Sequence, residues 1–167
     1  NTIVIVQDHE GPSFIVALDK RTGDKLWKMD RDERTTWTSP IVVEHGGKAQ
    51  VIVSATNRSR SYDLETGEVL WECGGMTGNV IPTPIAADGF VYLISGFRGA
   101  ALQAVNLANA MGDITESEEA IAWELIAIRL MCHHHSYTVI FYTFSIVTIL
   151  SQRSIVKQAL YSMVLID

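Results

Sequence analysis

The strongest constraint on the fold of this chain is a segment that occurs twice. Residues 17–27 and residues 61–71 share the pattern Asp-x-x-Thr-Gly-x-x-Leu-Trp after two small or apolar positions. The same 44-residue offset separates four pairs of landmarks: Asp19 and Asp63, Gly23 and Gly67, Trp27 and Trp71, Pro40 and Pro84. A period of this size indicates a repeat architecture, in which each repeat is one structural unit that packs against its neighbours.

Each copy of the segment contains the residues of a hairpin. The Asp can accept hydrogen bonds from the backbone two residues further on, and the Gly takes the φ > 0 conformation that closes the turn. Residues 14–18 are all apolar, which predicts a strand that is buried on both faces. Trp27 and Trp71 fall early in the returning strand, where a large ring with one N–H donor suits a boundary between packed sheets.

The repeat divides the first 125 residues into three units. The first is incomplete, with strands expected at residues 1–7, 14–19 and 25–29, the earliest of them buried, and a charged connector over residues 29–36. The second opens at Pro40, which must lie at the head or edge of a strand because it has no N–H to donate, and fits four strands into one period. The third opens at Pro84, turns at residues 88–89, and continues as strands at 90–95 and 101–107.

The last hairpin of the third unit is longer than the other two. Asn106 lies 17 residues before Trp123, whereas the Asp-to-Trp separation is 8 residues in each of the first two units. The difference is an insertion of nine residues that includes the acidic run 116–119. We expect that run to be a solvated surface insertion.

The composition changes abruptly after residue 125. Residues 1–125 contain all 12 glycines, all four prolines, 18 of the 19 acidic residues and 10 basic residues, for a net charge of −8. Residues 126–167 contain no Gly or Pro, three basic residues and one acid, for a net charge of +2. We therefore expect a repeat domain over residues 1–125, with units ending near residues 29, 73 and 125, followed by an apolar tail that does not match the repeat.

Three interpretations of the tail, residues 126–167, remain open. It is foreign to the fold, through a frame shift or a chimeric join; it holds a membrane segment; or it adds a capping element to the last unit. Residues 130–152 carry no formal charge and are long enough to span a bilayer, so membrane contact is expected only there. Neighbouring residues of a strand point to opposite faces, so the three histidines 133–135 do not form a convincing metal site.

The hairpin pattern, together with the Ser-Pro or Thr-Pro openings, resembles the pyrroloquinoline-quinone (PQQ)-like β-propeller repeat and its tryptophan-docking motif. The resemblance covers residues 1–125 and implies an all-β fold, a partial β-propeller of about 2.75 four-stranded antiparallel blades around a channel. The residues that match the structural motif are Asp19, Gly23, Trp27, Asp63, Gly67, Trp71, Asn106 and Trp123.

The resemblance implies two kinds of function. Quinoprotein dehydrogenases of this type hold PQQ and Ca²⁺, whereas the similar lipoprotein of the bacterial outer-membrane assembly machine has no cofactor and binds proteins. No Cys-Cys pair is present here, and no Asp, Glu or Asn could be matched to a ligand position of the dehydrogenases. The first hypothesis is therefore a non-enzymatic, cofactor-free scaffold in the periplasm or otherwise outside the cytoplasm. The alternative is a fragment of a PQQ- and Ca²⁺-dependent dehydrogenase.

The candidate site lies on loops. The sequence shows no nucleophile–base pair, phosphate-binding loop or zinc motif, and a net charge of −6 argues against a nucleic-acid partner. In a propeller, the connectors 29–37 and 72–80 and the loops 55–59 and 95–100 should crowd one mouth of the ring. Their candidate binding residues are Arg34, Trp37, Asn57, Arg58, Asn79 and Arg98. Three cations and a Trp at such a mouth could bind an anionic group or an extended peptide, although ordinary polar loops would look alike. Trp37 is the most distinctive, because the repeat has Ile81 in its place.

Overall fold

The computed structural model describes residues 1–127, which contain twelve strands and no helix. The strands are β1 (Thr2–Gln7), β2 (Ser13–Asp19), β3 (Lys25–Arg31), β4 (Ile41–His45), β5 (Lys48–Val53), β6 (Ser59–Asp63), β7 (Val69–Cys73), β8 (Ile85–Ala87), β9 (Phe90–Ser95), β10 (Ala100–Asn106), β11 (Gly112–Asp113) and β12 (Ile121–Ala127). Within the described part, no helix has the length and apolar character needed to cross a membrane.

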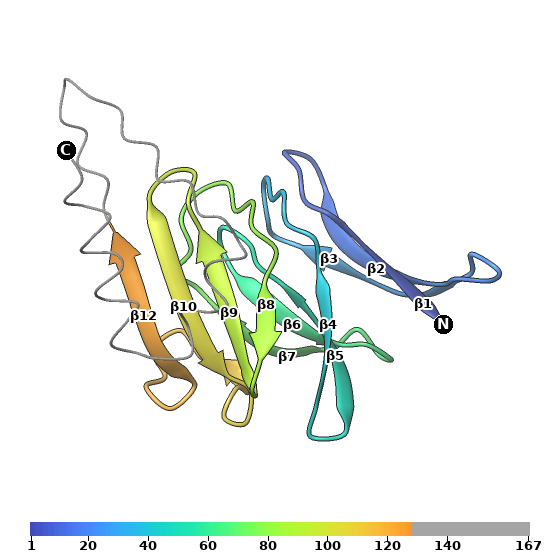
Figure 1. The fold of residues 1–167 in the computed structure, drawn as a ribbon. Coiled ribbons are helices and arrows are strands. Elements are labelled where there is room, and N and C mark those ends of the chain that lie inside the picture. Colours follow the sequence, from blue (N-terminus) through green and yellow to red (C-terminus); the bar gives the residue numbers. More distant parts are fainter. Residues whose placement is uncertain (128–167) are drawn as a thin grey trace. The chain divides into compact units, whose positions relative to one another are not determined.

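The strands form three sheets, which follow one another along the chain (Figure 1). The first sheet has the order β1-β2-β3, the second β11-β7-β6-β5-β4, and the third β12-β10-β9-β8. Every pairing between strands that are joined in sequence is antiparallel, as expected for propeller blades. The described chain is thus an all-β partial propeller with one incomplete and two complete blades, which confirms the fold class predicted from the repeat.

The core lies between the blades rather than inside any one of them. One buried cluster joins Ile15, Ala17 and Trp27 of the first blade to Val51, Val53 and Tyr62 of the second. A second cluster combines residues of the second and third blades, among them Ile52, Trp71, Leu93 and Val105. Each blade therefore buries its apolar residues against the next one, which is the reason a single blade cannot be stable alone.

The Asp-x-x-Thr-Gly hairpins have the predicted geometry. The Asp19 carboxylate accepts hydrogen bonds from the backbone N–H groups of Arg21 (2.8 Å) and Thr22 (3.1 Å). Asp63 repeats this arrangement with Glu65 (2.8 Å) and Thr66 (3.1 Å). These bonds lower the pKa of both carboxyl groups, because they stabilise the charged form.

Trp27 crosses from the first blade to the second. Its Nε1–H donates to the carbonyl oxygen of Leu64 (2.9 Å), and its ring lies against Gly67, where a Cβ atom would be 2.7 Å from Trp27 Cδ2. Two constraints therefore require a glycine at position 67. Its φ is +78°, and the ring of Trp27 occupies the space that a Cβ atom would need. The hairpin of the second blade is thus the docking surface for the Trp of the first blade.

The other two motif Trp residues have different partners. Trp71 is 1% exposed and donates its Nε1–H to Gln50 Oε1 (3.1 Å) within its own blade. Trp123 lies against Tyr92, with ring centroids 6.1 Å apart. The three Trp residues of the motif therefore differ in burial and in contacts, since Trp27 and Trp71 are buried whereas Trp123 is partly buried.

The insertion in the third hairpin reaches back to the second blade. Its residues Gly112 and Asp113 form β11, which pairs in parallel with Trp71 and Glu72 of β7. The next residue, Ile114, donates its N–H to the Glu72 carbonyl (2.9 Å) and is 2% exposed. The glutamates of the acidic run 116–119 are exposed as predicted, but the residues before them are part of a sheet and of the core.

Two strand predictions need correction. β1 was expected to be buried, but its side chains alternate between partly buried and exposed, and Ile3 and Ile5 are 47% and 43% exposed. The reason is that β1 pairs only with β2 within the described residues, so it is an edge strand. β3 extends to Arg31, so the connector begins two residues later than the sequence indicated.

The predictions for the tail lie outside the described residues. These are the capping element, the membrane segment at 130–152, the histidines 133–135 and the frame-shift interpretation. The domain boundary at residue 125 and the blade ends near residues 29, 73 and 125 likewise stay predictions.

We expect Gly67→Ala to destabilise the chain more than Gly23→Ala. Gly23 and Gly67 have φ values of 79° and 78°, a conformation that costs an L-residue about 1–2 kcal/mol. A Cβ at Gly23 meets nothing within 4 Å, whereas one at Gly67 collides with Trp27, which should cost about 1–3 kcal/mol more. Urea unfolding of the two variants measures the difference. Equal losses would contradict the docking of Trp27 on Gly67.

Candidate functional site

Hydrogen bonds connect the four predicted loop segments to one another. Loop 55–59 bonds to connector 29–37 through Asn57, whose Nδ2 donates to the Asp32 carbonyl (2.8 Å). It also bonds to connector 72–80, because the N–H of Asn79 donates to Thr56 Oγ1 (3.1 Å). Connector 72–80 in turn bonds to loop 95–100, since Thr77 Oγ1 donates to the Gly99 carbonyl (3.2 Å). We call the surface of these four segments the loop face.

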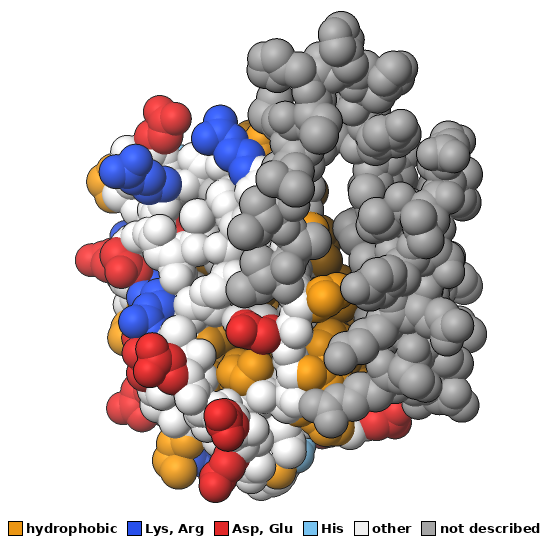
Figure 2. Space-filling view, turned by 90° about the vertical axis from the view of Figure 1, so that its left-hand side faces the viewer, with side chains coloured by type: hydrophobic (Ala, Val, Ile, Leu, Met, Phe, Trp, Pro, Cys, Tyr) orange, Lys and Arg blue, Asp and Glu red, His pale blue; other side chains and the backbone are white. Residues whose placement is uncertain are grey.

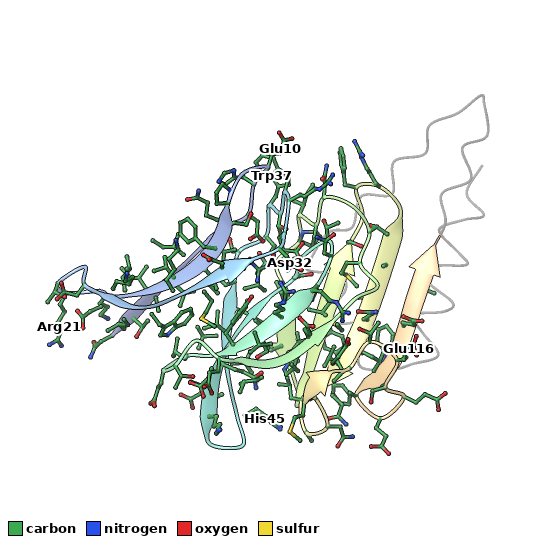
Figure 3. All side chains as sticks on the ribbon, turned by 180° about the vertical axis from the view of Figure 1, so that it is seen from behind. Glu10, Arg21, Asp32, Trp37, His45 and Glu116 are labelled. Carbon is green, nitrogen blue, oxygen red and sulfur yellow. The ribbon has the colours of Figure 1, made fainter. Side chains whose placement is uncertain are left out.

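Trp37 is the most exposed large ring of the loop face, at 67%. Figure 3 shows Trp37 at the same end of the strands as Glu10, while His45 and Glu116 lie at the other end. The backbone N–H of Trp37 donates to the Val80 carbonyl (2.8 Å), which places it beside Ile81, its equivalent in the repeat. Ile81 is 50% exposed, and Phe97 of the loop 95–100 is 56% exposed. The loop face therefore carries two exposed aromatic side chains, Trp37 and Phe97, and the exposed Ile81 follows directly after one of its segments.

The predicted polar residues differ in how free they are. Arg34 and Arg98 are exposed. Arg58 is engaged, because its Nη1 binds Asp113 Oδ2 (2.8 Å) and Thr115 Oγ1 (2.9 Å) of the insertion. Asn57 is committed to the Asp32 carbonyl, and Asn79 adopts a positive φ of 58° at a bend of its connector. On the face drawn in Figure 2, acidic and basic side chains are interspersed rather than gathered by sign.

A buried ion pair lies beneath the loop face. Arg31 Nε and Nη2 bind Asp8 Oδ1 (2.8 Å) and Oδ2 (3.0 Å), and both side chains are fully buried. Arg31 Nη1 also donates to the hydroxyl of Tyr62 in the second blade. Burial lowers the pKa of the Arg31 guanidinium, but the bonds to Asp8 outweigh this and leave the pKa raised. Burial also raises the pKa of Tyr62. Arg31 thus stays charged and links the first two blades.

Glu33 fixes the loop between β5 and β6. Its side chain is fully buried, and its two carboxylate oxygens accept the backbone N–H groups of Asn57 (2.9 Å) and Arg58 (2.8 Å). Its backbone carbonyl accepts the Ser13 hydroxyl (2.7 Å). One carboxylate of the first connector therefore holds the loop of the next blade in place.

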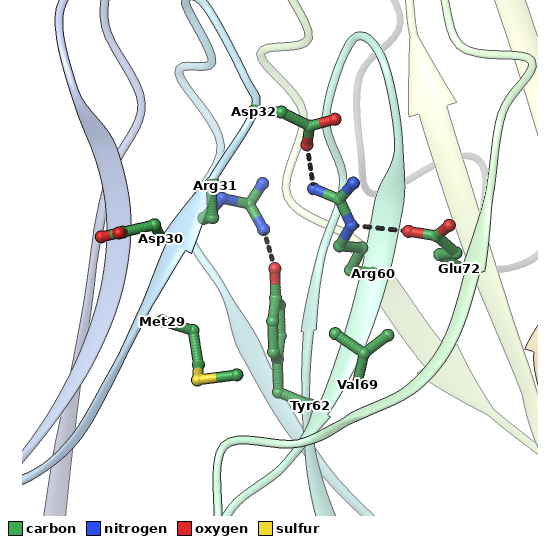
Figure 4. Close-up of a pocket in the computed structure, with 8 residues that line it drawn as sticks. All are labelled: Met29, Asp30, Arg31, Asp32, Arg60, Tyr62, Val69 and Glu72. Carbon is green, nitrogen blue, oxygen red and sulfur yellow. Dashed lines mark hydrogen bonds and ion pairs between the residues drawn. The ribbon is translucent and has the colours of Figure 1, made fainter.

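A groove of about 510 Å³ opens between the outer strands of the first two blades. It is lined by Met29, Asp30, Arg31, Asp32, Arg60, Tyr62, Val69 and Glu72 (Figure 4). Arg60 crosses it, with Nη1 bound to Asp32 Oδ1 (2.6 Å) and Nε bound to Glu72 Oε2 (2.7 Å). Burial lowers the pKa of Arg60, but its hydrogen bonds to these two carboxylates leave it raised, and the bond to Arg60 lowers the pKa of Asp32.

The charged residues of the groove do not fit a Ca²⁺ site for PQQ. Ca²⁺ is bound by several oxygen ligands that converge on one point. Here Asp32 and Glu72 are held apart by the Arg60 guanidinium, whose charge would repel a metal ion. Among residues 1–127, no group of three His, Cys, Asp or Glu side chains is placed to hold a metal ion.

Sequence reasoning missed the network of Asp8, Arg31, Glu33, Arg60 and Tyr62. It treated residues 30–34 only as a charged connector. The sequence did indicate that residues 30–34 are unusual, because the equivalent positions 74–78 of the second unit are Gly-Gly-Met-Thr-Gly and carry no charge. The charges are therefore not required by the repeat, and the same argument that singled out Trp37 would have singled out Arg31 and Glu33.

We expect Asp8→Asn to destabilise the chain by about 3–5 kcal/mol, because it leaves the buried Arg31 without its counter-ion. Arg58→Met is the control. Its pairs with Asp113 and Glu72 are partly exposed, so the stability lost in Arg58→Met should be much smaller than in Asp8→Asn. Urea unfolding at pH 7 measures both losses. A loss below about 1 kcal/mol for Asp8→Asn would contradict the buried pair.

The Asp113 carboxyl should titrate well below a free aspartate. The hydroxyl and N–H of Thr115, followed by Arg58, stabilise its charged form and lower its pKa to about 2. The unfolded value is about 3.9, so the stabilising contribution is complete above that pH and is lost as the pH falls through about 2. Carboxyl ¹³C NMR titration measures this pKa, and Arg58→Gln should raise it. An Asp113 pKa near 4 would contradict the contact.

Comparison with known proteins agrees with this architecture. The family model described as outer membrane protein assembly factor BamB matches residues 12–122. The BamB of Yersinia pestis is 31% identical over 137 residues, which cover 74% of this chain and 30% of that protein.

Solved structures add evidence on the fold alone. A europium-containing methanol dehydrogenase has a TM-score of 0.52 at 10% identity over 75% of this chain and 23% of its own. The quinohemoprotein alcohol dehydrogenase of Comamonas testosteroni has a TM-score of 0.51 at 19% identity over 74% and 19%. The family match and the observed blades together show that this chain belongs to the BamB family of PQQ-like β-propellers.

Proposed function

We propose that this chain is a non-enzymatic scaffold that binds a protein or an extended peptide through its loop face. The observation that carries the proposal is the exposure of Trp37 and Phe97 on segments that hydrogen bonds hold together, with the exposed Ile81 directly after one of these segments. Single exposed apolar residues are common, but several on one surface mark an interaction site. Trp is also enriched among the residues that contribute most to binding energy.

The charged groups indicate the chemistry of the partner. Arg34 and Arg98 are exposed on the same segments, so they favour a partner with apolar side chains and a carboxylate. Arg58 is not part of this surface in the proposal, because the insertion neutralises it. The buried contacts of Arg31 and Glu33 fix the loops beforehand, which reduces the entropy lost on binding.

The family gives the proposal its biological setting. The relative from Yersinia pestis is named as an assembly factor for outer membrane proteins. We propose a role of the same kind, outside the cytoplasm and without a cofactor, for the protein that contains this chain. The chain spans about 30% of the length of that relative, so other blades would share the partner.

We expect Trp37→Ala to weaken peptide binding at least tenfold, which corresponds to about 1.4 kcal/mol. Peptides selected from a phage-displayed library on the 167-residue chain are the probes, and fluorescence anisotropy measures their affinity. Val42→Ala is the control, because Val42 is 56% exposed but lies on β4, outside the four loop segments. We expect Phe97→Ala to weaken peptide binding as Trp37→Ala does.

Two results would contradict the proposed function. One is that the selected peptides bind Trp37→Ala as tightly as the original chain. The other is saturable quenching of Trp fluorescence by PQQ that requires Ca²⁺, which would favour the dehydrogenase alternative.

A further inference from the structure

The outer strands of the first two blades differ in what covers them. The outer edge of β7 pairs in parallel with β11, which belongs to the hairpin of the following blade. The outer edge of β3 has no such cover, because within residues 1–127 β3 pairs with β2 alone. The hairpin of the second blade, residues 63–71, is the short form and contains no insertion that could reach β3.

The free edge of β3 presents its backbone groups in the same register as the edge of β7 that pairs with β11. Lys28 pairs with Val16 as its repeat equivalent Glu72 pairs with Arg60. Glu72 directs its carbonyl away from β6, toward the N–H of Ile114 (2.9 Å). By the same alternation, the N–H and C=O of Lys28 point away from β2 and toward the open side. An added strand could pair there as β11 pairs with β7.

The groove beside β3 is the counterpart of the space that Ile114 fills. Ile114 is 2% exposed and belongs to the same buried cluster as Trp71 and Cys73. The equivalents of those two residues in the first blade are Trp27 and Met29, and Met29 lines the groove of about 510 Å³. Figure 4 shows the side chains of Met29 and Val69 facing each other across Tyr62. An apolar side chain from an added strand would enter the groove that Met29, Tyr62 and Val69 line.

The residues of β3 on either side of Met29 are charged, which bears on the sequence of an added strand. In the second blade, Asp113 is paired with Glu72, and Thr115 accepts the Gly74 N–H (3.2 Å). In the first blade, Lys28 replaces Glu72 and Asp30 replaces Gly74. These two side chains form an exposed ion pair with each other, with Lys28 Nζ 3.9 Å from Asp30 Oδ1. On an added strand, an acid would lie beside Lys28 and a base beside Asp30, and both would extend this pair. The two positions flank the apolar one, because side chains alternate along a strand.

We propose that the edge of β3 and its groove accept an extended strand from a partner protein. The strand adds parallel to β3 by β-augmentation and carries an acidic, an apolar and a basic residue in succession. This acceptor site shares residues 29–32 with the loop face, but it includes none of the exposed side chains Trp37, Ile81 and Phe97. It binds by backbone pairing, whereas the loop face binds through exposed side chains.

The test uses the segment that the chain itself docks on β7. The probe is a fluorescein-labelled peptide of residues 109–117 that carries Thr115→Lys, and fluorescence anisotropy measures its binding to the 167-residue chain. We expect saturable binding that Lys28→Pro weakens at least tenfold, because proline removes the outward N–H while an edge strand tolerates it. Lys28→Ala keeps the N–H and should weaken binding less than threefold.

A second pair of variants tests the groove without changing the backbone. Val69→Trp should fill the groove and weaken binding at least tenfold, whereas Val42→Trp places the same side chain on an exposed site of β4 and should leave binding unchanged. Trp37→Ala should not affect this peptide, so failure of this site and failure of the loop face are distinguishable. Absence of saturable binding at peptide concentrations up to about 1 mM would overturn the proposal. Binding that is insensitive to Lys28→Pro and Val69→Trp would overturn it too, as would self-association of the chain that Lys28→Pro abolishes.

Discussion

The indole of Trp27 leaves its own blade to bind the carbonyl of Leu64 and to lie against Gly67 of the next. This contact shows how the fold is held together, because the apolar residues of each sheet are buried only at the seam with its neighbour. The hairpin motif serves both sides of the seam, since one copy supplies the Trp and the next supplies the glycine turn. A repeat of this kind stabilises a blade through its neighbours, and its sequence period follows from that geometry.

The other end of the same seam is polar. Arg31 joins Asp8 to Tyr62, and Glu33 holds the backbone of Asn57 and Arg58. Buried charges of this kind add little net stability, but their directional bonds determine one arrangement of the loops. The loop face is thereby presented on a fixed frame, with Trp37 exposed on one of the connectors that the network anchors. The contact of Trp27 thus stabilises one end of the seam, whereas the bonds of Arg31 and Glu33 determine the loop geometry at the other end.

The sequence predicted those features that the repeat enforces. Asp19, Gly23 and Trp27 could be assigned because their roles depend on local backbone geometry and recur at Asp63, Gly67 and Trp71. The exposure of β1 could not be predicted, since it depends on which strand lies on its far side. The return of Gly112 and Asp113 to β7 is a contact over a long sequence separation without a local signal. Arg58 was predicted on the loop face, but its carboxylate partner lies in that same insertion.

Hydrogen–deuterium exchange of the 167-residue chain, with and without a peptide selected from a displayed library, tests the central claim most directly. The account predicts slower exchange in residues 29–37, 72–80 and 95–100 of the loop face, and unchanged exchange in the hairpins at residues 19–24 and 63–68. Protection confined to those hairpins, or spread evenly over all three blades, would contradict the claim that this propeller segment binds its partners through the loop face.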